Sequence, residues 1–204
     1  EGGECESRRL NVVFDLDETL VVAIPEKTLG SDLIVPIRTQ DGKVQRLGVY
    51  FRPHLIETLT ELNKVCNIYI LTASQKEYAD AILDKIEKLA SPIFKGRYYK
   101  NSCTKLPNGR YIKDLAVLSL PLSRSVLVDN CPFAFGKHLL NCVPILPFTG
   151  NKADDQLPSL QAYLTTLAGD GCDVREGVQR QFRWIDMHLG GDWKELSRVF
   201  LRSK

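Results

Sequence analysis

Short apolar runs alternate along this chain with longer stretches whose apolar residues recur every three or four positions. The runs at residues 10–14, 66–71 and 125–128 have the length of buried strands. Helical spacing begins after Pro53 and again after Ser74. Strands that alternate with helices predict an α/β fold with a parallel sheet flanked by helices.

The predicted helices carry recognisable start signals. Pro53 suits the first turn of a helix, because its missing N–H has no intrahelical partner there in any case. Ser74 and Glu77 have the spacing of a capping box, which predicts that Ser74 caps the second helix. Further helices are expected over residues 156–167 and after Asp173.

Residues 32–52 have a different pattern, which is typical of a β-hairpin. Two extended runs flank Asp41 and Gly42, and Asp-Gly between such runs is a turn signal. Pro36 lies inside the first run, and proline cannot donate a ladder hydrogen bond, so this strand is expected at a sheet edge. We therefore expect a small β insertion after the first strand.

Three of the predicted strands run directly into residues that can do chemistry. Asp15 and Asp17 follow the first strand, Thr72 follows the second, and Asp129 and Asn130 end the third. In open α/β sheets, ligands bind beyond the carboxyl ends of the strands. These five residues are therefore expected to share one edge of the sheet.

The two aspartates suit phosphoryl transfer, which needs an in-line nucleophile and proton transfer to the leaving group. Asp15 and Asp17 are two positions apart and point the same way at a strand end. One carboxylate can attack phosphorus and form an aspartyl-phosphate, while the other protonates the leaving group.

The remaining polar residues suit the charge of a phosphoryl group. Thr72 offers a hydroxyl and the N–H groups of a helix start to a phosphate oxygen. Lys113 supplies a positive charge. Asp129 and Asn130 supply oxygen ligands, which Mg²⁺ prefers.

Composition and charge narrow the class of protein. The chain has 204 residues, 44% of them apolar and 25% charged, which suits one globular domain. A net charge of +2 is not that of a polyanion binder, so no direct nucleic-acid partner is expected. One basic run without acidic residues comprises Lys95, Arg97, Lys100, Lys105, Arg110 and Lys113. It is either a solvated loop or an arc that attracts an anionic substrate.

The six cysteines form no C-x-x-C pair and are expected to be reduced thiols. The spacing of Cys131, His138 and Cys142 fits no standard zinc site. No apolar run approaches the length of a membrane span. We expect an intracellular protein that is nuclear or cytoplasmic. A location in an organelle is not excluded, because a chain that starts with Glu1 can lack its natural N-terminus.

Several motifs in sequence order resemble one family. Residues 15–20 (D-L-D-E-T-L) are similar to the D-x-D-x-T signature of haloacid dehalogenase phosphatases. Residues 51–54, 71–80, 101–103, 111–115 and 128–132 are similar to further elements of its C-terminal-domain phosphatase group, also called NLI-interacting-factor-like. The resemblance covers residues 10–182 and implies a Rossmann-like sheet, with the β insertion in place of a large cap.

The resemblance also implies the role of each residue. Asp15 would be the nucleophile and a metal ligand, and Asp17 the general acid and base, with its backbone carbonyl on Mg²⁺. Thr72 and Lys113 would hold the phosphoryl oxygens. Asn130 would ligate the metal. Asp129 would orient Lys113 and a metal-bound water.

Two further residues are substrate-binding candidates. Tyr78 is either a substrate contact or part of the core. Lys100 stands where the group usually has an arginine that contacts substrate phosphate, and a lysine lacks the two-point geometry of a guanidinium. If Lys100 is instead a solvated loop residue, Arg97 or Arg110 could take the place of that arginine. Arg52 and His54 are expected to organise the junction between insertion and helix.

The leading hypothesis is a Mg²⁺-dependent phosphatase that acts on phosphoserine or phosphothreonine in proteins. The alternatives are a lipid or small-metabolite phosphatase, and a non-catalytic binding module on the same fold. We expect one domain over residues 1–204, with the insertion at about 32–52 and a helical extension at about 173–204. Trp193, Leu196 and Phe200 have helical spacing in that extension, which either packs on its own domain or docks a partner.

Overall fold

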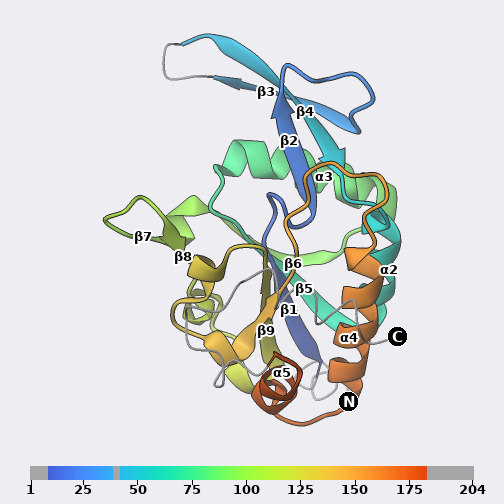
Figure 1. Cartoon of the computed structure of the whole chain (residues 1–204), viewed down its shortest axis with the longest axis vertical. Coiled ribbons are helices and arrows are strands. Elements are labelled where there is room, and N and C mark those ends of the chain that lie inside the picture. The colour runs from blue at the N-terminus through green and yellow to red at the C-terminus, as the bar shows by residue number, and fades with distance from the viewer. Residues whose placement is uncertain (1–8, 39–41, 183–204) are drawn as a thin grey trace.

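The computed structural model describes residues 9–38 and 42–182, and its centre is a five-stranded parallel sheet of order β10-β9-β1-β5-β6 (Figure 1). The strands are β1 (Leu10–Phe14), β5 (Cys66–Leu71), β6 (Phe94–Tyr98), β9 (Ser125–Asp129) and β10 (Cys142–Pro144). β1 is central and pairs in parallel with β5 on one side and β9 on the other. The α/β fold with a parallel sheet, predicted from the alternation of strands and helices, is confirmed.

The two faces of the sheet are covered differently. The helices are α2 (Leu55–Val65), α3 (Lys76–Ala90), α4 (Gln156–Gly169) and α5 (Val174–Phe182). Val12 and Phe14 point to one face and share a core with buried residues of all four helices. Val13 and Leu127 point to the other face, where they pack against the short 3-10 segments Leu115–Leu118 and Pro132–Phe135. One face is therefore thickly covered and the other only thinly.

The β insertion is larger than the sequence predicts. β2 (Val21–Pro25), β3 (Leu33–Arg38) and β4 (Val44–Phe51) form an antiparallel sheet of order β2-β4-β3, at the top of Figure 1. The hairpin of β3 and β4 is confirmed, and Pro36 lies on the edge strand as expected. The expected start near residue 32 is wrong, because β2 also pairs with β4, from Val21 opposite Phe51 onward. The Asp41 position of the predicted turn lies outside the described residues.

Arg52 joins the insertion to the main domain. Its side chain is buried and donates to both carboxylate oxygens of Asp154, at 2.7 and 2.9 Å. It also donates to the carbonyl oxygens of Thr19, at 3.0 Å, and Leu146, at 2.8 Å. His54 follows at the start of α2 with a φ of 65° and caps no N–H group with its side chain. The expectation that Arg52 organises this junction is confirmed.

The described part of the C-terminal extension packs on its own domain. Val174, Val178 and Phe182 of α5 are buried, and the Phe182 ring meets Tyr163 of α4 edge-on at 5.6 Å. Trp193, Leu196 and Phe200 lie outside the described residues, so a docking role there stays a prediction.

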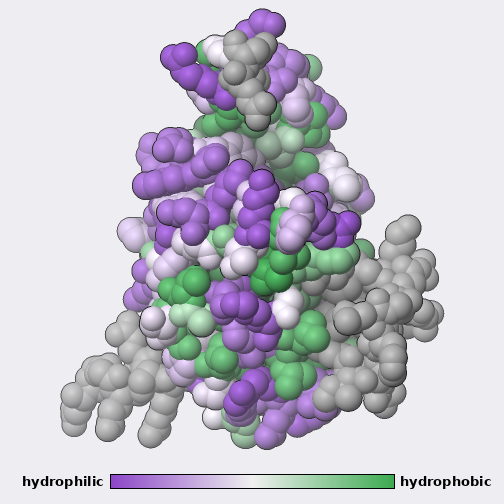
Figure 2. Space-filling view, turned by 90° about the vertical axis from the view of Figure 1, so that its left-hand side faces the viewer, coloured by the Kyte–Doolittle hydropathy of each residue, from purple (hydrophilic) through white to green (hydrophobic). Residues whose placement is uncertain are grey.

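The side of the molecule with the small hairpin of β7 (Thr104–Lys105) and β8 (Tyr111–Ile112) faces the viewer in Figure 2. Hydrophilic residues dominate it, and apolar residues reach the surface in separate small areas. In the part of the chain that the structure describes, no helix is long and apolar enough to cross a membrane. All five cysteines of that part are free thiols.

Candidate active site

The carboxyl ends of β1, β5 and β9 bring the predicted residues to one edge of the sheet. Asp15 directly follows β1, and its N–H donates to the Val128 carbonyl of β9 at 2.9 Å. Thr72 directly follows β5, and its N–H donates to the Tyr98 carbonyl of β6 at 3.0 Å. The sheet pairing therefore continues one residue beyond the strands and fixes the backbone of both residues.

A buried lysine lies between two buried carboxylates. Lys113 Nζ is 2.5 Å from Asp15 Oδ1 and 2.6 Å from Asp129 Oδ2. Burial would lower the pKa of Lys113, but the charges of Asp129 and Asp15 outweigh burial and raise it. The lysine is therefore charged at neutral pH and can attract a phosphoryl group beside Asp15.

Asp129 contacts Lys113 with one carboxylate oxygen and accepts a backbone N–H with the other. Its Oδ1 accepts the Cys131 N–H at 2.7 Å, while Oδ2 contacts Lys113. Burial raises the pKa of Asp129 to about 6, although Lys113 opposes the shift. Both Asp129 oxygens are engaged by these contacts, which favours orientation of Lys113 over direct metal ligation.

Thr19 brings the oxygens of Asp15 and Asn130 together. Its hydroxyl lies 3.4 Å from Asp15 Oδ2 and 3.2 Å from Asn130 Oδ1. The Asn130 amide nitrogen donates to Glu18 at 3.1 Å, which directs the amide oxygen toward Thr19 and Asp15. Glu18 itself has a positive φ of 59°, which places its side chain at this turn.

These oxygens fit a magnesium ion. Mg²⁺ is commonly held by one or two carboxylates together with water and phosphate, and Asp15 and Asn130 present such oxygens from neighbouring strands. Two carboxyl groups, those of Asp15 and Asp129, face the single ammonium group of Lys113, so a cation beside Asp15 would add favourable charge. Across residues 9–38 and 42–182, no cluster of three or more His, Cys, Asp or Glu side chains has a metal-site arrangement. The predicted set differs from such clusters, because it adds an amide oxygen and the Asp17 carbonyl.

Asp17 is held by two hydroxyl groups. Ser74 Oγ donates to Asp17 Oδ2 at 2.6 Å, and the Tyr78 hydroxyl donates to Oδ1 at 2.6 Å. Burial raises the pKa of Asp17 above its ordinary value, although both hydrogen bonds pull it the other way. A raised pKa suits a carboxyl group that must carry a proton for the leaving group.

The capping prediction for Ser74 is wrong. α3 begins at Lys76, its N-cap residue is Gln75, and no side chain caps it. The Ser74 hydroxyl is unavailable for capping because it binds Asp17 instead.

Thr72 lies at the strand end and not at the start of a helix. Its Oγ1 accepts the Ser74 N–H at 3.0 Å, which leaves the hydroxyl proton free to point elsewhere. The Thr72 and Ser74 N–H groups already have partners, so phosphate binding by backbone N–H groups in this segment stays a prediction. The hydroxyl remains available to a phosphoryl oxygen.

Lys100 lies at the rim of this site. Its N–H donates to the Ser74 carbonyl at 3.0 Å, and its ammonium lies 5.5 Å from the centre of the Tyr111 ring. Thus the backbone brings Lys100 next to the residues that hold Asp17, while its side chain extends toward β8.

The basic run does not form one continuous positive arc. Arg97 is paired with three carboxylates of α3, those of Asp80, Asp84 and Glu87. The central carbon of the Arg110 guanidinium lies 3.6 Å from the centre of the Phe133 ring. Lys113 contacts Asp15 in the candidate site. These contacts leave Arg97 poorly suited to replace the missing arginine at position 100.

Sequence reasoning gave no role to Thr19 and Glu18 and misassigned Ser74. Thr19 and Glu18 belong to the D-L-D-E-T-L motif, so their proximity to Asp15 was a usable signal. Ser74 gave no such signal, because its partner Asp17 is 57 residues away.

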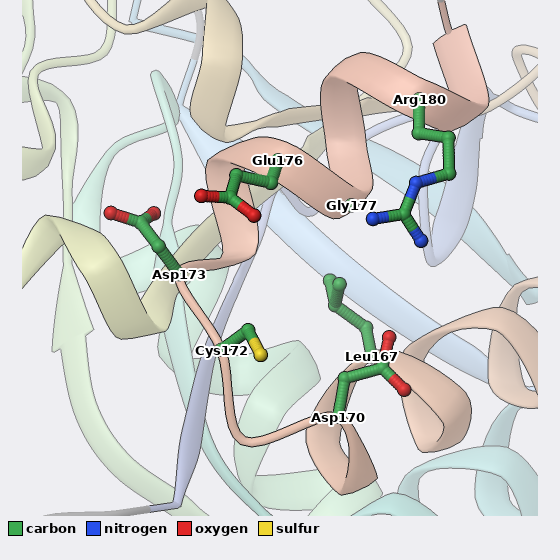
Figure 3. Close-up of a pocket in the computed structure, with 7 residues that line it drawn as sticks. All are labelled: Leu167, Asp170, Cys172, Asp173, Glu176, Gly177 and Arg180. Atoms are coloured by element: carbon green, nitrogen blue, oxygen red, sulfur yellow. The ribbon is translucent and has the colours of Figure 1, made fainter.

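A cavity of about 230 Å³ lies elsewhere, between the end of α4 and α5. Figure 3 shows Asp170, Glu176 and Arg180 around it. Arg124, which immediately precedes β9, donates to carbonyls of Ala168 and Cys172 in the same region. The cavity is therefore near the amino ends of the strands, and the candidate site is at their carboxyl ends.

Comparison with known proteins agrees with this geometry. The sequence profile of the NLI interacting factor-like phosphatase family matches residues 10–175. The human protein named carboxy-terminal domain RNA polymerase II polypeptide A small phosphatase 1 is 33% identical over 163 residues, which cover 80% of this chain and 61% of that protein. Phosphatase Herzog of Drosophila melanogaster is 35% identical over 155 residues, covering 76% of this chain and 43% of that protein. This chain thus spans about two fifths to three fifths of the length of these relatives.

A solved structure supports the fold. The structure of Fcp1, described as an essential RNA polymerase II CTD phosphatase, aligns with a TM-score of 0.73 at 14% identity, covering 91% of this chain and 76% of that one. At this identity the likeness concerns the fold, and it confirms the predicted haloacid dehalogenase-like architecture. Together with the profile and the relatives, it establishes that the chain belongs to the NLI interacting factor-like phosphatase family.

Proposed function

We propose that this chain is a magnesium-dependent phosphatase that removes phosphate from phosphoserine or phosphothreonine in proteins, through an aspartyl-phosphate on Asp15. The observation that carries the proposal is the contact of buried Lys113 with both Asp15 and Asp129, beside an Asp17 held by hydroxyl groups. This arrangement combines a carboxylate nucleophile, a fixed positive charge and a second carboxyl group.

The first half-reaction forms the covalent intermediate. A carboxylate oxygen of Asp15 attacks phosphorus, and the bond from phosphorus to the leaving oxygen breaks. Lys113 and the Thr72 hydroxyl stabilise the charge on the phosphoryl oxygens. Asp17 gives its proton to the leaving oxygen, so the alcohol departs neutral.

The second half-reaction restores the enzyme. Asp17, now ionised, takes a proton from water as the water oxygen attacks phosphorus. The bond between phosphorus and Asp15 breaks, and inorganic phosphate leaves. A Mg²⁺ ion on Asp15, the Asp17 carbonyl and Asn130 would neutralise phosphoryl charge throughout.

Family membership and the names of the relatives support a phosphoprotein substrate. The β insertion also supports it, because a three-stranded sheet is small compared with a large cap, and a site without a large cap would admit a peptide. We infer a nuclear or cytoplasmic location from the names of the relatives, one of which refers to RNA polymerase II.

The test is hydrolysis of 4-nitrophenyl phosphate by the purified chain with and without Mg²⁺, compared with Asp15→Asn. Metal-dependent turnover in the wild type and none in the variant is the expected result. Inactivity of the wild type would favour the binding module. Among active enzymes, preference for phosphatidic acid or sugar phosphates over phosphoserine peptides would overturn the proposed substrate class.

A further inference from the structure

Each oxygen of the Asp17 carboxyl group accepts a hydrogen bond from a different hydroxyl group. The Ser74 hydroxyl donates to Oδ2 and the Tyr78 hydroxyl donates to Oδ1, both at 2.6 Å. With one donor alone, the carboxyl group could still rotate about the Cβ–Cγ bond of Asp17. Two donors on two oxygens fix both its direction and its plane.

The chemistry of these donors differs from that around Asp15. Asp15 contacts the charged Lys113, whereas the partners of Asp17 are neutral. A hydroxyl group can donate or accept by rotating, so it stays compatible with either protonation state of a carboxyl group. Neutral donors can therefore direct Asp17 while favouring its ionised form less strongly than a charged partner would.

The segment that carries both hydroxyls is anchored at two points. The Ser74 carbonyl accepts the Lys100 N–H at 3.0 Å. In the first turns of α3, Asp80 accepts from the Tyr99 hydroxyl at 2.6 Å and from Arg97 at 3.0 Å. Ser74 and Tyr78 are thus tied to β6 and to the residues that directly follow it, which fixes the position of the two donors.

We propose that Ser74 and Tyr78 are positioning residues, whose hydroxyl groups aim the Asp17 carboxyl group at the leaving-group oxygen. This inference rests on the proposed role of Asp17 as the general acid. Proton transfer in the transition state requires hydrogen-bond geometry, so a carboxyl group that rotates away loses part of its effect. Neither hydroxyl is required to touch the phosphoryl group.

The experiment measures kcat/KM on aryl phosphates whose phenols range from acidic to weakly acidic. Good leaving groups need little protonation, whereas poor ones depend on the acid. Tyr78→Phe and Ser74→Val are therefore expected to lose roughly tenfold on the poorest leaving group and little on the best, a part of the ~10²–10⁴ that general acids contribute.

Matched variants separate positioning from packing. Ser74→Thr has the shape of Ser74→Val but keeps a hydroxyl, so it should restore the wild-type dependence on the leaving group. Tyr99→Phe removes a hydroxyl that binds a carboxylate of the same helix but not Asp17, so its dependence should match wild type. Adding Tyr78→Phe to Asp17→Asn should cost nothing further, because the hydroxyl then has no acid to aim.

An equal loss across all leaving groups, or no loss, would overturn the inference. Crystal structures of Tyr78→Phe and Ser74→Val provide a readout that does not need turnover. The Asp17 carboxyl group should rotate in these variants, and an unchanged orientation would overturn the inference even in an inactive protein. Lack of turnover by the wild type on every aryl phosphate is a different result, which rejects the proposed function itself.

Discussion

Replacement of Arg52 by methionine should destabilise the protein more than replacement of any exposed cation. The guanidinium is almost fully buried, and the change removes its hydrogen bonds to Asp154, Thr19 and Leu146. Loss of one partner of a buried ion pair costs roughly 3–5 kcal/mol. The Asp154 side chain is 12% exposed, so water can partly replace the lost donor. We therefore expect a loss of about 3 kcal/mol in the free energy of unfolding.

The assay is urea unfolding followed by circular dichroism, with thermal unfolding as a second measure. A loss of this size corresponds to a fall in Tm of roughly 6–12 °C for a domain of this length. Lys64→Met is the matched control, because Lys64 pairs with Glu61 at 2.6 Å while both side chains are well exposed. Exposed pairs contribute at most about 1 kcal/mol. Equal losses in the two variants would refute the reasoning.

A double-mutant cycle tests the partner directly. Asp154→Asn keeps an oxygen that can accept the Gln156 N–H but removes the charge. The loss in Arg52→Met/Asp154→Asn should be smaller than the sum of the two single losses, because both act on one pair. Additive losses would mean that Arg52 acts independently of Asp154, through packing and its hydrogen bonds to the Thr19 and Leu146 carbonyls.

Three further predictions concern the site and the thiols. Asp15→Asn should abolish turnover of an aryl phosphate in a protein that still folds, because only a carboxylate can form the intermediate; residual turnover would contradict this. Lys100→Ala should raise KM for an anionic phosphopeptide, more so at low salt, and leave kcat on 4-nitrophenyl phosphate unchanged, whereas Arg97→Ala should affect stability instead. Burial raises the pKa of the Cys66 thiol to about 11. At pH 8 a thiol reagent should therefore modify exposed Cys131 at once and buried Cys66 only after unfolding, and mass spectrometry detects each modification.

The central strands were predictable because each is a buried apolar run with an abrupt polar end. β5 spans Cys66–Leu71, as expected, and β9 extends one residue beyond the expected run, to Asp129. β2 was missed because Val21–Pro25 follows the D-L-D-E-T-L motif with no turn residue between them, and its partner β4 comes much later in the chain. Pairing between distant strands leaves no mark on the local pattern.

The site was predictable in its membership and less so in its contacts. Lys113 is far in sequence from Asp15, and only the family resemblance, not spacing, places them together. The Ser74 hydroxyl was assigned to a helix cap because a local rule fitted it, but a tertiary partner competes better. The pairing of Arg97 did have a signal, since Asp80, Asp84 and Glu87 form an acidic stripe at helical spacing.

The central place of β1 in the sheet has a consequence for synthesis on the ribosome. β1 is made first, yet its two neighbours come much later: Asn11 contacts Asn67 and Ser125, which are 56 and 114 residues further on. At about 5–20 residues per second, the second neighbour appears roughly 6–23 s after β1. Throughout that interval one edge of a strand that is wholly buried in the folded protein lacks its partner, and such edges promote aggregation. The yield of folded protein is therefore expected to depend on translation speed and on chaperones that bind the first half of the chain.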